Sequence, residues 1–286
     1  MKKQAILSLS PIGHDTAAAL MIDGEIVAAC VQERYTRDKH SYKFPLEAVK
    51  DCLSIAGISV HEVDMVAVSW MPKLAIREQY LKYALKNDNR LAFLVNDFEL
   101  IKNLFDIENI IPKKLNYNGR IEYINHHLCH LASTYYSSGF DDALVVSYDG
   151  VGEIDTMAIA TGEHGIISVK ENSNKYPNSL GLLYAAVTHY LGWKYCYDEG
   201  IVMGLASLGD SNAIIPGKDI SYLKVFEKTL EIKDDFIYEL NFPDYMNFFD
   251  ARDVWIGNKF IEYFGAKRNK NDEITQHHMN IAAGLQ

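Results

Sequence analysis

The first candidate for chemistry is the segment Asn125-His126-His127-Leu128-Cys129-His130, which follows an apolar run and opens a helical pattern. His126 and His130 are four residues apart, so both imidazoles project from one face of a helix, a common start for a metal site. Such a pair also occurs as ordinary surface or core histidines. Asp149 ends the run VVSYD in a DGxGE turn, and a carboxylate with two imidazoles suits a first-row metal. The sequence therefore predicts a divalent-metal site at His126, His130 and Asp149.

A second candidate is His14-Asp15, in the polar turn after the first apolar run. An imidazole titrates near neutral pH, so His14 is suited to take a proton from a substrate hydroxyl. A turn histidine beside an aspartate that caps local backbone is an equally good interpretation. We name His14 and Asp15 as the candidate catalytic residues.

Weaker candidates are basic side chains and glycines. Arg34, Arg37, Lys39 and His40 follow a strand-like run and suit a phosphate or carboxylate, although a solvated charged loop is the better explanation. Glycine-rich segments allow a ligand to approach the backbone closely, but neither segment here is a Walker motif. The candidate substrate contacts are Arg34, Arg37, Lys39 and His127, and the candidate cofactor contacts are Gly150, Gly152, Glu153, Gly200 and Gly204.

Composition narrows the class of protein. The 286 residues are 48% hydrophobic and 23% charged, with a net charge of −10, which argues against nucleic-acid binding. The four cysteines form no CxxC pair and sit among apolar neighbours, which indicates free thiols in a reducing compartment. The start of the chain is too short for a signal-peptide core, and no apolar run has the length of a membrane span. We expect a cytoplasmic protein, and a homodimer is left open.

The expected elements alternate between strands and helices. Asp23-Gly24 predicts a tight hairpin between the second and third strands. The segment 72–113 breaks the alternation and reads as a helical insertion closed by Pro112. We expect strands at 4–10, 17–22, 26–32, 63–69 and 120–124, helices at 45–57, 127–136, 179–192 and 273–286, and a glycine-rich loop at 198–210.

Residues 143–171 look like a second copy of residues 5–33. A constant offset of 138 pairs Gly24 with Gly162 and Glu33 with Glu171, without gaps. Two unrelated β-meanders would also look similar, but the equal spacing favours duplication. A repeated β-β-β-α pattern predicts an α/β protein with the two-lobed actin-like, Hsp70-like and sugar-kinase-like architecture. We place the first lobe at 1–140, with the insertion at about 72–113, and a C-terminally incomplete second lobe at 141–286.

Four segments resemble, in the same order, the NodU/CmcH carbamoyltransferases, which include nodulation-factor and antibiotic-tailoring O-carbamoyltransferases. The segments are GHDTAAALMIDGEIVAACVQERYTRDKH, NHHLCHLASTYYSSGFDDALVVSYDGVGE, SLGLLYAAVTHYLGW and EGIVMGLASLG. The resemblance covers essentially the whole chain and implies an N-terminal domain of the actin-like superfamily. It also implies a C-terminal YrdC-like domain, absent from this chain, that makes carbamoyl-adenylate from carbamoyl phosphate and ATP. The N-terminal domain would then transfer the carbamoyl group to a hydroxyl of a small molecule or sugar.

The resemblance also implies an iron held by an HxxxH pair and two aspartates, matching His126, His130 and Asp149. The second aspartate of the family lies beyond residue 286, so this chain is expected to bind metal weakly. Ile201 replaces the lysine of the family's GEGKVMGLA motif, which puts a charge contact there in doubt. Two alternatives remain: an ATP-dependent kinase of the same superfamily, against which the HxxxH pair speaks, and a truncated binding module without catalysis.

Overall fold

The computed structural model describes residues 4–85, 94, 98–171, 173–233, 237–242, 244–247 and 255–286. Its N-terminal part is a mixed five-stranded sheet in the order β3-β2-β1-β4-β5. The strands are β1 (Ala5–Ser10), β2 (Ala17–Ile22), β3 (Glu25–Val31), β4 (Met65–Val68) and β5 (Arg120–Tyr123). β1, β2 and β3 form an antiparallel meander, whereas β4 and β5 run parallel to β1. Asp23 and Gly24 both have positive φ, as the predicted hairpin requires.

Helices cover this sheet and complete its core. The short helix α1 (Glu33–Thr36) is followed by α2 (Leu46–Ala56), which ends at Gly57 in the left-handed conformation as expected, and by η1 (Val60–Glu62). The helical segment between β4 and β5 contains α3 (Pro72–Ala75), the π-helical turn η2 (Ile76–Leu81), α4 (Lys82–Ala84) and α6 (Phe98–Leu115). Ile107 and Ile111 of α6 are buried with Leu7, Leu9 and Val66 of the sheet. α6 thus lies in the helical segment expected at 72–113 and serves as the crossover between the parallel strands β4 and β5.

The second sheet is smaller among the described residues. β6 (Asp142–Tyr148), β7 (Met157–Glu163) and β8 (Ile166–Val169) form an antiparallel meander in the order β6-β7-β8. Helix α7 (His126–Ser138) packs on it through Leu131 and Tyr135, which are buried against Val145 and Ala160. α7 thus lies against the second sheet, although it follows β5 directly in the chain.

The two meanders repeat, but the gapless offset of 138 is wrong beyond the first strand. Gly24 is a turn residue, whereas Gly162 lies inside β7, where it pairs with Ala143 and Ile167. The hairpin turn of the second meander is His164-Gly165, with φ of 50° and 81° against 52° and 87° at Asp23-Gly24. β7 therefore extends further along the chain before it turns. The duplication is one of topology and turn conformation, not of equal spacing.

The rest of the second lobe is mainly helical. α8 (Leu180–Tyr190) is capped by Ser179, whose Oγ accepts from the backbone N–H of Leu182. The expected loop at 198–210 is wrong for most of its length, because Glu199–Ala206 forms α9 and buries Val202 and Leu205. The remaining elements are α10 (Tyr222–Thr229), β9 (Leu230–Ile232), β10 (Tyr238–Leu240), α11 (Asn258–Phe264) and α12 (Gln276–Leu285). Tyr222, Phe260 and Ile281 are fully buried in this core.

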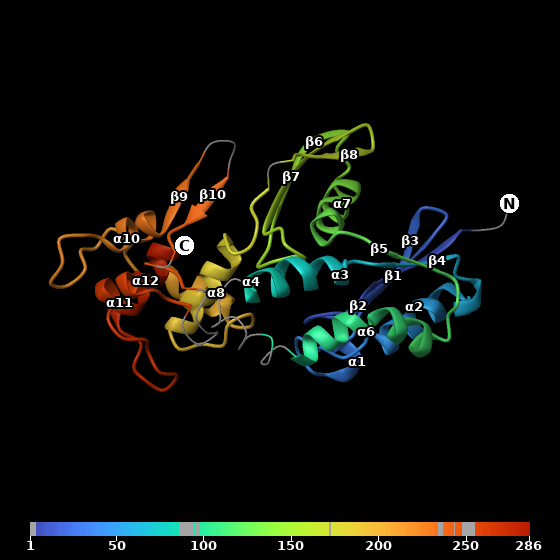
Figure 1. Cartoon of the computed structure of the whole chain (residues 1–286), viewed down its shortest axis with the longest axis horizontal. Helices are drawn as coiled ribbons and strands as arrows, with labels where there is room; N and C mark the ends of the chain where they lie inside the picture. Colours follow the sequence, from blue (N-terminus) through green and yellow to red (C-terminus); the bar gives the residue numbers. More distant parts are fainter. Residues whose placement is uncertain are drawn as a thin grey trace.

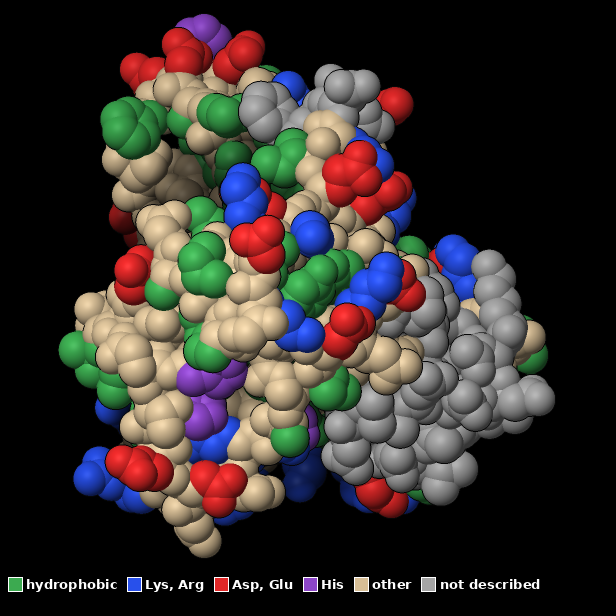
Figure 2. Space-filling view, turned by 90° about the vertical axis from the view of Figure 1, so that its left-hand side faces the viewer, with side chains coloured by type: hydrophobic (Ala, Val, Ile, Leu, Met, Phe, Trp, Pro, Cys, Tyr) green, Lys and Arg blue, Asp and Glu red, His purple; other side chains and the backbone are tan. Residues whose placement is uncertain are grey.

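The chain has an α/β fold in two parts, each of which contains a three-stranded antiparallel meander. Figure 1 shows the five-stranded sheet with α2 and α6 on one side of the molecule and α8 to α12 on the other, with β6 to β8 and α7 between them. The termini lie at opposite ends. On the face shown in Figure 2, acidic and basic side chains of the described residues are interspersed, without a continuous basic surface.

Candidate metal centre and interlobe cavity

Helix α7 begins where the sequence predicts it. Asn125 is the N-cap, and its side-chain oxygen accepts from the backbone N–H of Leu128 at 2.9 Å. This cap fixes the first turn of the helix. His126 and His130 therefore share one face of the helix, and their Nε2 atoms are 3.0 Å apart.

Asp149 completes a group of three converging ligand atoms. Its Oδ2 lies 2.9 Å from His126 Nε2 and 3.5 Å from His130 Nε2. One atom from each of the three side chains lies within 4.8 Å of the others. Asp149 reaches this position because it follows β6 directly, and its Oδ1 accepts from the backbone N–H of Gly150 at 2.6 Å.

The surroundings orient these side chains as a metal site requires. His126 Nδ1 lies 3.1 Å from the carbonyl oxygen of Ser69, at the end of β4. Because a carbonyl only accepts, Nδ1 carries a proton, and Nε2 is the ring nitrogen left to bind a metal in place of its hydrogen bond to Asp149. Two imidazole nitrogens and one carboxylate form a donor set that fits a divalent first-row metal.

The electrostatics of the group follow from burial and mutual contact. Burial raises the pKa of Asp149, but hydrogen bonds from His126 and His130 outweigh it and hold the pKa well below its usual range. Burial lowers the pKa of His126, but its contact with the Asp149 carboxylate more than compensates and raises it. Asp149 is therefore an anion at neutral pH, as a cation ligand must be.

Glu153, a candidate cofactor contact, is buried in the interior instead. It is 0% exposed, and burial raises its pKa. Its carboxylate accepts from the backbone N–H of Met71 at 2.7 Å and of His126 at 3.2 Å, and from Asn125 Nδ2 at 3.1 Å. Glu153 ties the end of β4 to the start of α7, so it supports the site from behind and has no free edge for a ligand.

The glycines near Asp149 differ in what surrounds them. A Cβ on Gly152 would lie 3.0 Å from His127 Cδ2 and 3.2 Å from His126 Cβ, so Gly152 lets the turn approach α7. A Cβ on Gly150 would meet no atom within 4 Å. On Gly181 of α8, a Cβ would lie 2.7 Å from the backbone nitrogen of Gly150. Close packing of α8 against the 149–150 turn thus requires Gly181, which the sequence reasoning missed.

His127, a candidate substrate contact, points into the core. It is 1% exposed, with Nδ1 2.9 Å from Ser147 Oγ and Nε2 2.8 Å from the carbonyl oxygen of Asp155. Burial lowers its pKa. Because both ring nitrogens are engaged, the expected substrate contact is wrong. The sequence spacing already indicates that His127 is buried: His127, Leu131 and Tyr135 follow one another at intervals of four residues and therefore share the buried face of the helix.

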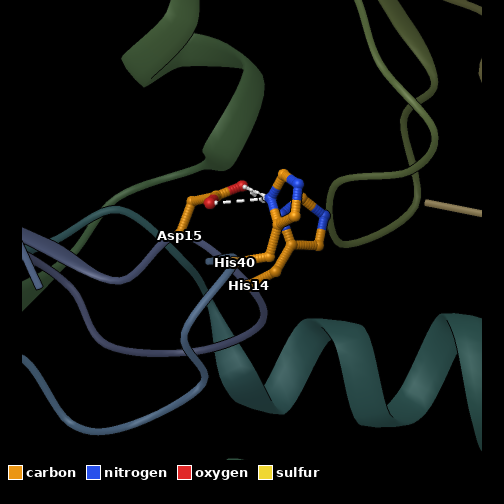
Figure 3. Close-up of side chains that lie close together, drawn as sticks. All are labelled: His14, Asp15 and His40. Carbon is orange, nitrogen blue, oxygen red and sulfur yellow. Dashed lines mark hydrogen bonds and ion pairs between the residues drawn. The ribbon is translucent and has the colours of Figure 1, made fainter. Parts of the chain in front are cut away.

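His14 and Asp15 form a second cluster, and it includes His40 (Figure 3). His14 Nδ1 lies 2.6 Å from Asp15 Oδ2, while His40 Nδ1 lies 3.0 and 3.1 Å from the two oxygens of Asp15. Burial raises the pKa of Asp15, but hydrogen bonds from both histidines outweigh it, and the net pKa is lowered. These are hydrogen-bond distances, so one carboxylate orients two imidazoles. The sequence places His40 in a basic loop and does not predict its contact with Asp15.

One cavity of about 800 Å³ connects the two clusters. His14 and Tyr42 of the first lobe line it, as do His126 and Asp149. Tyr195, Cys196 and Tyr197 line it from the second lobe, together with Leu182 of α8 and Trp255. A space of this size holds a ligand as large as a nucleotide or a small sugar.

The remaining candidates lie outside the described lining of this cavity. Arg34, Arg37 and Lys39 are exposed on or after α1. Gly200 and Gly204 lie on the exposed face of α9, where an added Cβ would meet no described atom within 4 Å, and Ile201 beside them is 48% exposed. No helix among the described residues combines the length and apolar character that a membrane crossing requires.

The chain is similar to longer proteins of bacteria. An uncharacterized protein of Synechocystis sp. is 34% identical over 98% of this chain and 46% of its own length. The nodulation protein NolNO of Sinorhizobium fredii is 31% identical over 96% of this chain and 36% of its own length. The chain thus spans less than half the length of these relatives.

Solved structures are more distant. YeaZ from Pseudomonas aeruginosa shares 15% identity at a TM-score of 0.36, covering 61% of this chain and 68% of its own. Component A of the Acidaminococcus fermentans (R)-2-hydroxyglutaryl-CoA dehydratase shares 10% identity at a TM-score of 0.38, covering 75% and 62%. Residues 5–286, however, match the family model of the carbamoyltransferase N-terminus, and the chain therefore belongs to that family.

Proposed function

We propose that this chain is the N-terminal catalytic part of an O-carbamoyltransferase. It transfers the carbamoyl group of carbamoyl-adenylate to a hydroxyl of a small molecule or sugar. The observation that carries the proposal is the shared cavity, because the group suited to activate a hydroxyl and the group suited to hold a cation face the same space. The family match and the nodulation relative support carbamoyl transfer. Carbamoyl-adenylate is made from carbamoyl phosphate and ATP by a YrdC-like domain, a partner outside the 286 residues.

His14 is the general base in this proposal. Asp15 accepts from Nδ1–H, so Nε2 of His14 carries the lone pair, and half of its side chain is exposed at the cavity. The acceptor hydroxyl gives its proton to Nε2 while its oxygen bonds to the carbamoyl carbon. The bond from that carbon to the phosphate oxygen breaks, and AMP leaves with the electron pair. Asp15 holds the imidazole in the required tautomer, as a carboxylate does in a catalytic triad.

His126, His130 and Asp149 would hold a divalent metal, which we propose is iron. When bound, the metal supplies Lewis-acid polarisation of a carbonyl oxygen. The chain keeps these ligands ready in two ways: Ser69 fixes the tautomer of His126, and the Asn125 cap fixes the start of the helix.

The nucleotide half of the donor is assigned to glycines of the second lobe. Gly150 has open space beside it at the edge of the metal group, which allows a phosphate to approach the backbone. Gly200 and Gly204 leave a side-chain-free surface on α9. Ile201 offers no charge there, so binding at α9 would rest on backbone contact alone.

The test replaces His130 by alanine and measures both metal content and carbamoyl transfer. Carbamoyl phosphate, ATP and a YrdC-like domain in trans supply the donor, and a panel of sugars supplies the acceptor. His130→Ala is expected to lose stoichiometric metal and transfer, because one of three ligand atoms is removed. His61→Ala, an exposed histidine of η1, is the matched control. Unchanged metal and transfer in His130→Ala would sink the proposal. If the wild-type protein phosphorylates the acceptor from ATP without carbamoyl phosphate, the chain is a kinase. If the wild-type protein binds no metal and transfers no carbamoyl group, the chain is a binding module.

A further inference from the structure

His40 takes part in the cluster around Asp15 as fully as His14 does. Its Nδ1 is near both oxygens of the carboxylate, at 3.0 and 3.1 Å, whereas His14 Nδ1 is near one. A carboxylate only accepts, so each histidine donates its Nδ1–H to Asp15. Figure 3 shows both rings next to the Asp15 carboxylate, and their centroids lie 6.0 Å apart with the rings nearly perpendicular. Asp15 therefore accepts from both histidines, so His40 holds the carboxylate that orients His14.

The backbone brings this contact about at a conformational cost. Asp15 and His40 both have positive φ, at 59° and 55°, which for residues other than glycine costs about 1 kcal/mol each. Two links between the neighbouring residues hold them in register: the backbone N–H of Thr16 donates to Ser41, and Thr16 Oγ1 donates to the carbonyl oxygen of Lys43. The N–H of His40 donates to Glu33 Oε2 at 3.2 Å. Strain of this kind concentrates at functional sites.

The other edge of the His40 ring meets the second lobe. Its centroid lies 4.6 Å from that of Tyr197, with the rings nearly perpendicular. Lys194 Nζ lies 3.3 Å above the Tyr197 ring. His40 Nε2 is one of two buried side-chain polar atoms, among the described residues, that have no hydrogen-bond partner. A ring whose Nε2 is enclosed and unpaired acts through Nδ1 alone, so His40 is not itself placed to contact substrate.

We propose that His40 is a positioning residue for the transfer reaction: by donating Nδ1–H to Asp15, it fixes the carboxylate that sets the tautomer of His14. This rests on the proposed role of His14 as the general base. Without the His40 donor, the Asp15 side chain turns about its own torsions and His14 loses a fixed partner for its Nδ1–H. Its Nε2 lone pair then faces the cavity for only part of the time. Because Tyr197 backs the ring, the cluster is complete only with the second lobe in place.

The test compares three replacements of His40 that differ in where they carry an N–H. Asparagine places its amide nitrogen close to the Nδ1 position, glutamine places it further out, and leucine has none. The ring nitrogens of His14 are observed by NMR on the chain labelled with 15N-histidine, with His14→Ala for assignment. Wild type and His40→Asn are expected to show the Nδ1–H tautomer of His14. His40→Leu and His40→Gln are expected to show a mixture.

Transfer rates supply the second readout. The kcat is expected to fall by up to about 100-fold in His40→Leu and His40→Gln at unchanged KM for the donor, and to recover largely in His40→Asn. A wild-type tautomer in His40→Leu, or in His40→Gln where the leucine variant does not fold, overturns the inference. The inference is also overturned if His40→Asn shows no more of the Nδ1–H tautomer and no faster transfer than His40→Gln. If His14→Ala transfers as well as wild type, the general base is wrong, and the tautomer measurement still decides what His40 does to Asp15 and His14.

Discussion

The turn after β1 and the turn after β6 occupy the same place in two similar meanders, yet they are held in different ways. In the first lobe the turn contains two residues with positive φ, Gly13 and Asp15, and it has open space around Gly13. In the second lobe the turn is packed against α7 at Gly152 and against α8 at Gly181. In the first turn, the conformation of the backbone itself positions the candidate base, His14. In the second turn, packing against α7 and α8 positions the candidate metal ligand, Asp149.

The partners of the two turns also differ. Asp15 is met by the loop after α1, whereas Asp149 is met by α7, which precedes β6 in the chain. Each turn thus carries a carboxylate, Asp15 two residues before β2 and Asp149 directly after β6, and the segments that surround each carboxylate decide its chemistry. The comparison predicts that changes in one turn leave the function of the other intact.

The largest expected effect is on metal affinity. Asp149→Asn should weaken metal binding by more than the roughly 10- to 100-fold that loss of an outer partner costs, because a charged ligand becomes a neutral amide. Asp15→Asn should leave the metal dissociation constant unchanged while it disturbs the His14 tautomer. Calorimetric titration with Fe²⁺ without oxygen, or with Mn²⁺, measures the first effect. Equal losses in both variants would mean that the two turns are not independent.

The next effect is on stability through packing. Gly181→Ala should lower the free energy of unfolding by about 2 kcal/mol, because the new Cβ meets the backbone of Gly150. Gly150→Ala, which meets no atom within 4 Å, is the matched control and should change it by less than about 0.5 kcal/mol. Urea unfolding at a constant m-value measures both. If Gly150→Ala lowered the free energy of unfolding as much as Gly181→Ala, close packing of α8 against this turn would not explain the loss.

A smaller loss is expected in the first lobe. Gly13 has φ of 77° with open space around it, so Gly13→Ala should cost about 1 kcal/mol through backbone strain alone. The dissociation constant for metal should stay at the wild-type value. A variant that keeps full stability would show that the first turn is not held by its conformation. Thermal unfolding and the same metal titration provide the two measurements.

The smallest expected effect concerns pH. Burial depresses the pKa of His127 below its unfolded value of about 6.5, so its neutral form stabilises the fold above that pH. This contribution is lost as the pH falls from about 6.5 through the folded pKa, because the unfolded state binds the proton first. His127→Gln should flatten the decline in unfolding free energy over this window. An identical slope in wild type and variant, measured with EDTA present, would exclude His127 as its source.

Local sequence determined the features that need only nearest neighbours. The four-residue spacing of His126 and His130 sets their common face, the Asn125 cap starts the helix, and Asp23-Gly24 makes the hairpin, since each depends on backbone geometry within one turn. The polar turns that follow residues 10 and 148 begin at the ends of strands, as expected, because the length of an apolar run limits the length of the strand. The glycine-rich stretch 198–210 was misjudged as a loop because burial of Val202 and Leu205 outweighs the low helix propensity of glycine.

Tertiary structure alone decided the partnerships across long stretches of chain. His40 is 25 positions after Asp15, and the Thr16 hydrogen bonds, the contact of His40 with Glu33 and two left-handed residues bring them together. Glu153 looked like a ligand contact, yet the approach of β4 and α7 buries its carboxylate against their N–H groups. Residue type sets which hydrogen bonds a side chain is able to make. Which ones it does make depends on packing between elements, because a buried polar group must be paired by whatever lies beside it.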